Sequence, residues 1–145
     1  MPSSIASRAL GASHPTRQPW RVVALLALVL LAAFVAPPAQ ALALLVLAPV
    51  LEEVVFRAGL QSFLLQHLRG HAAFGAHTAN LLTAVAFAAA HVAVRPSLLA
   101  ALTLVPALLV GALYQRQRRL VPCIALHAAF NAIWLLWAGF SIDLV

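Results

Sequence analysis

Long apolar segments, most of them near the length that crosses a bilayer, constrain this chain more than any other feature. A helix needs about 20 apolar residues to cross roughly 30 Å of hydrocarbon. Such segments form helices because hydrocarbon offers the backbone no hydrogen-bond partners. The segments cover approximately residues 22–36, 41–68, 78–94, 97–113 and 120–140. The sequence therefore predicts an all-α, polytopic transmembrane helix bundle with about five spans.

The composition supports a membrane protein and argues against a nucleic-acid binder. Apolar residue types make up 64% of the chain and charged types 8%, whereas an ordinary soluble domain is about one quarter charged. The formal charge is +6, but the arginines lie mostly between apolar segments and not on one water-soluble face. The predicted counter-charge is therefore the anionic headgroups of the lipid bilayer, and no nucleic acid is expected.

The N-terminal part has two interpretations. Residues 1–21 form a basic, polar tail, and residues 22–145 are predicted to be a single membrane-embedded domain. The favoured interpretation keeps the first apolar segment as a transmembrane helix. The small-x-small sequence at residues 39–41 also fits a signal-peptide cleavage site, which would leave four spans.

Arginines are distributed asymmetrically over the predicted connections. With a cytoplasmic N-terminus, Arg95 is alone on the outer side of the membrane. Seven arginines then lie on the inner side: Arg8, Arg17, Arg21, Arg69, Arg116, Arg118 and Arg119. This bias follows the positive-inside rule, so we expect the N-terminus in the cytoplasm.

Two of the three acidic residues of the chain, Glu52 and Glu53, stand side by side within an apolar segment. A charged side chain at the bilayer centre costs about 2.5–3.5 kcal/mol even on mild scales, so such a pair indicates function. Glu53 and Arg57 are four residues apart and share a helix face, which predicts an ion pair. Glu52 is rotated by about 100° from Glu53 and lacks such a partner, which makes it the candidate general base.

Two further polar pairs have the same spacing of four residues, Phe87 with His91 and His127 with Asn131. An imidazole beside a carboxylate can share the activation of a water, and a second imidazole with an amide can donate hydrogen bonds to an oxyanion. Each of these residues alone is often an interhelical hydrogen-bonding group worth about 0.6 kcal/mol. Their combination with an intramembrane Glu pair favours a hydrolytic site.

These residues resemble the signature motifs of the CPBP family of intramembrane proteases, which includes type II CAAX prenyl endopeptidases and bacterial Abi proteins. The resemblance covers about residues 41–140, and the motifs lie within residues 52–131. In this sequence they read Glu52-Glu53-x-x-x-Arg57, Phe87-x-x-x-His91 and His127-x-x-x-Asn131.

The resemblance implies an all-helical intramembrane endopeptidase, and our own expectation is that it needs no cofactor, although many relatives are labelled metalloproteases. Glu52 and His91 would activate the attacking water, and His127 with Asn131 would stabilise the oxyanion. The supporting residues would be Glu53, Arg57 and Phe87.

The resemblance also suggests a substrate and a location. The chain is much shorter than the prenyl proteases, and Ala58 separates Arg57 from Gly59, where many relatives have glycine directly after the arginine. Very short bacterial relatives suggest cleavage of a membrane-anchored protein or peptide near the C-terminal anchor of an exported protein. The expected location is the bacterial inner membrane.

Three alternatives remain open at the level of sequence. Glu52, His91 and His127 could bind zinc in a CAAX-type metalloprotease, although the chain lacks His-Glu-x-x-His. Cys123 stands four residues before His127 and could form a thiol–imidazole dyad with it. A non-enzymatic role, in bacteriocin immunity or as a scaffold, would use the motifs only to hold the fold.

The predicted segment ends place the candidate residues at different depths. Glu52 lies about 17 Å below the outer boundary, at 1.5 Å per residue. His91 is three residues from the outer end of its segment, whereas His127 is seven residues from the inner end of its own. A shared site then requires tilted helices, different helix ends, or a break near Pro49 that begins a re-entrant half-helix.

Overall fold

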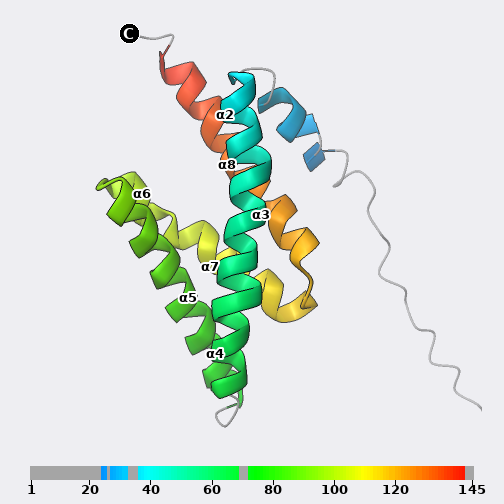
Figure 1. Ribbon diagram of the computed structural model, residues 1–145, viewed down its shortest axis with the longest axis vertical. Coiled ribbons are helices and arrows are strands. Elements are labelled where there is room, and N and C mark those ends of the chain that lie inside the picture. The colour runs from blue at the N-terminus through cyan, green and yellow to red at the C-terminus, as the bar shows by residue number, and fades with distance from the viewer. Residues whose placement is uncertain (1–23, 26, 33–35, 69–71, 143–145) are drawn as a thin grey trace, which may run out of the picture.

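The structure is a computed structural model that describes residues 24–25, 27–32, 36–68 and 72–142 (Figure 1). Helices dominate this part of the chain, and it contains no strand, which confirms the all-α prediction. The elements in chain order are α2 (Pro38–Leu42), η1 (Ala43–Leu47), α3 (Ala48–Glu53), η2 (Val54–Gln61), α4 (Ser62–His67), α5 (Ala72–Val94), α6 (Leu98–Leu102), α7 (Leu104–Gln117) and α8 (Leu120–Ile142).

Four helical stretches within the described residues are long and apolar enough to cross a membrane. They are Pro38–His67, Gly75–Val94, Leu98–Gln117 and Leu120–Trp137. The polytopic bundle predicted from the sequence is thereby confirmed. The predicted first span, 22–36, lies partly outside the described residues, and the basic tail 1–21 lies wholly outside them. Its residues 24–25 and 27–32 are helical, and Ala32 packs in a cluster with residues of α2, η1 and α8.

The first long helix, α2 to α4, buries every fourth residue. The buried row consists of Ala41, Leu45, Pro49, Glu53, Arg57, Gln61 and Leu65. In a pure α-helix, a row of spacing four turns by about 40° at each step. The π-helical segments η1 and η2 put more residues into each turn, because their hydrogen bonds run from residue i to i+5. This reduces the rotation of the row, which packs against α5, α7 and α8.

The helix continues through Pro49, so the possibility of a break there that begins a re-entrant half-helix is wrong. Pro49 is fully buried. Just before it, the Ala48 N–H donates to the Ala43 carbonyl, five residues back. Local π hydrogen bonding of this kind lets a transmembrane helix tolerate a proline.

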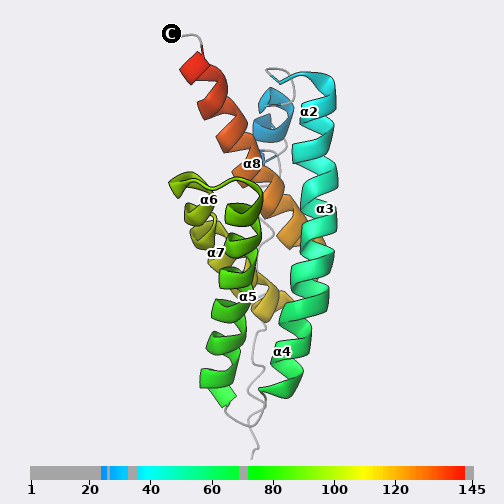
Figure 2. The same cartoon turned by 60° about the vertical axis from the view of Figure 1, so that its left-hand side comes forward.

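The other three long helices pack against the buried row of the first one, with α8 beside its upper part and α5 beside its lower part. Contacts join α5 to α7 and α7 to α8. Helix α8 crosses obliquely behind α2 and α3 in Figure 1 and inclines away from α2 in Figure 2. A turn at Thr103 separates α6 from α7. The chain reverses into α8 at Arg118, whose φ of 52° is left-handed.

Candidate active site

A small cavity lies where four helical stretches meet, between the buried row of the first helix and helices α5, α7 and α8. Its volume is about 50 Å³, which accommodates a few water molecules but not a peptide segment. The lining residues are Glu53, Arg57, Phe87, His91, Thr103, Pro106, Ala107, Val110, His127, Phe130 and Asn131. The cavity thus gathers residues of all three sequence motifs, but Glu52 itself is not one of its lining residues.

Glu53 is almost completely buried, and both of its oxygens accept hydrogen bonds. Arg57 donates from Nε to Oε2 at 3.0 Å, which confirms the ion pair predicted from the spacing. His127 Nδ1 lies 2.9 Å from Oε1. Removing two charges from water is costly, and such a pair persists only when further hydrogen bonds satisfy both groups. The guanidinium meets this condition, because it also donates to Gln61 and to the Ala107 carbonyl.

The contact with Glu53 determines which nitrogen of His127 donates the hydrogen bond between them. A carboxylate that is ion-paired with arginine can only accept, so His127 Nδ1 must donate. The other nitrogen, Nε2, lies 3.6 Å from Oε2 of Glu52. The carboxylate of Glu53 therefore holds the His127 imidazole in an orientation in which Nε2 faces the carboxylate of Glu52.

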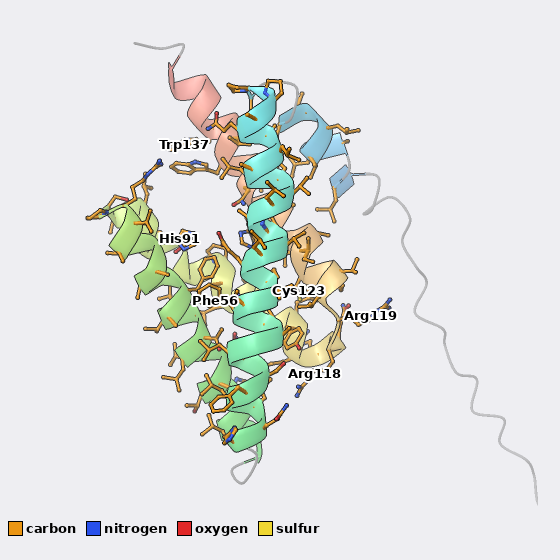
Figure 3. The ribbon with its side chains drawn as sticks, viewed as in Figure 1. Phe56, His91, Arg118, Arg119, Cys123 and Trp137 are labelled. Atoms are coloured by element: carbon orange, nitrogen blue, oxygen red, sulfur yellow. The ribbon has the colours of Figure 1, made fainter. Side chains whose placement is uncertain are left out.

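His91 is held in the same way by a backbone acceptor. Its Nδ1 donates to the Phe87 carbonyl at 3.0 Å, and its Nε2 lies 3.9 Å from Oε2 of Glu52. The ring of Phe87 contacts both imidazoles, with its centroid 4.4 Å from that of His91 and 5.8 Å from that of His127. The ring of Phe56 lies 5.0 Å from that of Phe87. Figure 3 labels Phe56, which belongs to η2, and His91, which belongs to α5.

Glu52 thus lies between two imidazole nitrogens. Its Oε2 is buried and has no hydrogen-bond partner, while 29% of the side chain is exposed. Separations of 3.6 and 3.9 Å are too long for direct hydrogen bonds, so Oε2 faces both imidazole nitrogens without being bonded to either. The structure therefore brings the side chains of Glu52, His91 and His127 close together.

Asn131 lies in the cavity wall one helical turn after His127. Its Nδ2 donates to the carbonyl of Leu44 in η1 at 2.8 Å. The amide group has a second hydrogen on Nδ2 and an acceptor oxygen. The side chain is therefore anchored to the first helix while part of its hydrogen-bonding capacity stays available.

The sequence analysis missed Gln61, which extends the buried row beyond Arg57. Its Oε1 accepts from Arg57 Nη1 at 3.2 Å, and its Nε2 donates to the Gly111 carbonyl of α7 at 3.0 Å. Glu53, Arg57 and Gln61 follow one another at intervals of four, but in an α-helix this spacing turns Gln61 about 80° away from Glu53, so the spacing alone did not predict the contact.

Cys123 and a metal centre were the two rival chemistries. Cys123 is fully buried, and its Sγ donates to the Arg119 carbonyl at 3.3 Å. Figure 3 shows it toward the turn that bears Arg118 and Arg119, away from His91. Within the described residues, no group of three or more His, Cys, Asp and Glu side chains is arranged to hold a metal ion, so we derive no step through a metal.

The conflict in depth disappears because the helices do not run parallel. The inclination of α8 (Figures 1 and 2) brings His127 to Glu53, although counting from the helix end placed it deeper. Oblique packing was one of the solutions that the sequence allowed.

Comparison with known families gives one match. The family model of type II CAAX prenyl endopeptidases, described as Rce1-like, matches residues 18–133, which include all of the motif residues. No curated protein and no solved structure matches significantly.

Proposed function

The chain belongs to the Rce1-like family of type II CAAX prenyl endopeptidases and is a membrane peptidase, and from this premise we propose a glutamic mechanism of peptide hydrolysis. The observation that carries the proposal is the buried, unpartnered Oε2 of Glu52 between two imidazole nitrogens. A water at this point would contact a carboxylate and two imidazoles. Membership in a peptidase family also favours catalysis over the immunity or scaffold role.

The first step is attack of this water on the scissile carbonyl. Glu52 takes a proton from the water, and His91 orients the water through Nε2, because its Nδ1 is committed to the Phe87 carbonyl. The water oxygen forms a bond with the carbonyl carbon, and the carbonyl oxygen becomes an oxyanion. General-base assistance of this kind contributes about 10²–10⁴-fold.

The oxyanion then needs hydrogen-bond donors that already point toward it. His127, protonated on both nitrogens, donates from Nε2 while Glu53 accepts from Nδ1. Asn131 donates the second hydrogen of Nδ2. When the tetrahedral intermediate collapses, the C–N bond breaks and the proton held by Glu52 passes to the leaving amine.

The remaining motif residues act through these groups. Glu53 orients His127, and Arg57 balances the charge of Glu53. Phe87 packs against the rings of both His91 and His127 and supports their orientation. These residues are positioning residues and do not contact the substrate.

We further propose that the substrate is a membrane-anchored protein or peptide, cut near a C-terminal anchor, in the bacterial inner membrane. A cavity of about 50 Å³ suits the scissile bond alone, so the rest of the substrate would bind outside the cavity. The family name adds a prenylated CAAX peptide as a second candidate.

The test uses the full-length chain in liposomes with two reporters, a farnesylated CAAX peptide and a peptide with a C-terminal transmembrane anchor. We expect the wild type to cleave the anchored peptide, His91→Ala to be slower by about 10²-fold, and a metal chelator to have no effect. Loss of cleavage on chelation would replace the glutamic mechanism with zinc chemistry. Absence of cleavage of both reporters would contradict the proposed substrate classes.

A further inference from the structure

Pro49 lies one turn before the glutamate pair, and the proposed mechanism gives it no role. It is fully buried and stands in the row of spacing four that also contains Glu53. A proline has no backbone N–H, so one carbonyl in the preceding turn loses its donor. Which carbonyl this is depends on the hydrogen-bond register of that turn.

The register is visible in the residue just before the proline. The Ala48 N–H donates to the Ala43 carbonyl, five residues back. In the same register, the N–H of residue 49 would donate to the carbonyl of Leu44. Because residue 49 is proline, the Leu44 carbonyl is left without this donor.

The Leu44 carbonyl is the group that accepts from Asn131. The Nδ2–O distance is 2.8 Å, and the two residues are 87 positions apart in the chain. A backbone carbonyl deprived of its helical partner is a strong acceptor that gains from a new donor, especially away from water. The carbonyl that lacks a helical donor because residue 49 is proline is therefore the same carbonyl that anchors the Asn131 amide.

We infer that Pro49 is a positioning residue for Asn131: it frees the Leu44 carbonyl, which then holds the Asn131 amide in the cavity wall. The inference rests on the proposed function for its catalytic meaning. Since one hydrogen of Nδ2 is committed to Leu44, the direction of the second hydrogen is fixed. A carbonyl acceptor also determines which end of the amide is nitrogen.

The first experiment measures the position of the amide without using activity. Asn80 and Asn131 are the two asparagines of the chain, so side-chain ¹⁵N labelling of asparagine gives two NH₂ groups in an NMR spectrum. Pro49→Ala and Pro49→Val both restore an N–H at residue 49, and valine also maintains much of the volume. We expect both variants to shift the Asn131 signals and to leave those of Asn80 in place.

Pro122→Ala is the matched control. Pro122 lies in the first turn of α8, where a backbone N–H has no helical acceptor in any case. We expect this variant to leave both asparagine signals unchanged. Asn131 signals that stay in place in Pro49→Val would overturn the inference.

The second experiment separates the inference from the proposed function by a double-mutant cycle on kcat. We expect Pro49→Val to lower kcat by about tenfold, the worth of one lost hydrogen bond, and to have no further effect in an Asn131→Ala background. Equal losses in both backgrounds would overturn the catalytic coupling. If the amide signal moves but Asn131→Ala cleaves at the wild-type rate, Pro49 still positions the amide and the oxyanion role of Asn131 is wrong.

Discussion

At the residue scale, the two adjacent carboxylates have opposite environments. Both Glu53 oxygens accept hydrogen bonds, whereas Glu52 Oε2 accepts none. The pairing of Glu53 with Arg57 could be predicted, because helix geometry fixes which residues share a face. The contact of Glu53 with His127, 74 positions away, could not, because helical periodicity does not determine how two helices pack.

Glu53→Gln tests the structural role that we assign to Glu53. The variant leaves the buried guanidinium of Arg57 without its counter-charge, so we expect a loss of about 3 kcal/mol in the free energy of unfolding. Cleavage falls as well, because His127 Nδ1 loses its carboxylate. Unfolding of the purified variant in detergent measures the loss, and wild-type stability would contradict the role given to Glu53.

Cys123→Ala tests the thiol alternative. The side chain is fully buried and hydrogen-bonded to backbone near the start of α8. We expect the variant to retain most of the wild-type cleavage rate, with a small decrease in stability from the lost volume. An inactive variant that remains folded by circular dichroism would return the nucleophile role to Cys123.

At the scale of elements, the buried row of the first helix joins the site to α7. Glu53, Arg57 and Gln61 form one hydrogen-bonded series, and Gln61 ends it on the Gly111 carbonyl. The sequence predicted only the first pair, because an α-helical periodicity of 3.6 moves later residues off the face. The π-helical turns that keep Gln61 in the row have no reliable sequence signal.

Close packing around Gly111 leaves no room for a side chain next to this hydrogen-bonded series. A Cβ at this position would collide with Oδ1 of Asn80 and lie 3.0 Å from Nη1 of Arg57. We expect Gly111→Ala to destabilise the protein by about 1–3 kcal/mol and to reduce cleavage by displacing Arg57. Thermal unfolding and cleavage rate measure the two effects.

Gly59→Ala is the control for this substitution, since its Cβ would meet only the Val54 carbonyl, at an ordinary 3.6 Å. Alanine also favours a helix more than glycine does. We expect wild-type stability or slightly more. Equal losses for the two variants would mean that close packing at Gly111 is not the cause.

At the scale of the whole molecule, apolar segment lengths predicted the four described spans, but their ends were less accurate. Helix α5 begins at Ala72 and helix α7 ends at Gln117, whereas the sequence suggested that the corresponding segments begin at residue 78 and end at residue 113. Polar residues were assigned to the connections, yet Gln115 lies within α7 and donates to the Ala76 carbonyl of α5. Contacts between helices extend both of them beyond their apolar parts.

The arginine distribution predicts the orientation of the bundle. Pro96 and Gln117 are exposed and lie at opposite ends of the α6–α7 stretch. In a Cys123→Ala background, we expect Pro96→Cys to react with a membrane-impermeant maleimide in intact cells, and Gln117→Cys only after permeabilisation. The reverse pattern would place the N-terminus outside.

The most direct test of the glutamic mechanism is the cleavage rate of Glu52→Gln, measured beside its thermal unfolding on the same purified protein. Glutamine has nearly the same shape but cannot accept the proton of the attacking water. The account predicts a decrease in kcat of about 10³-fold with an unfolding midpoint equal to that of the wild type, since Glu52 has no hydrogen bond at Oε2 to lose. Cleavage at the wild-type rate by Glu52→Gln would contradict it.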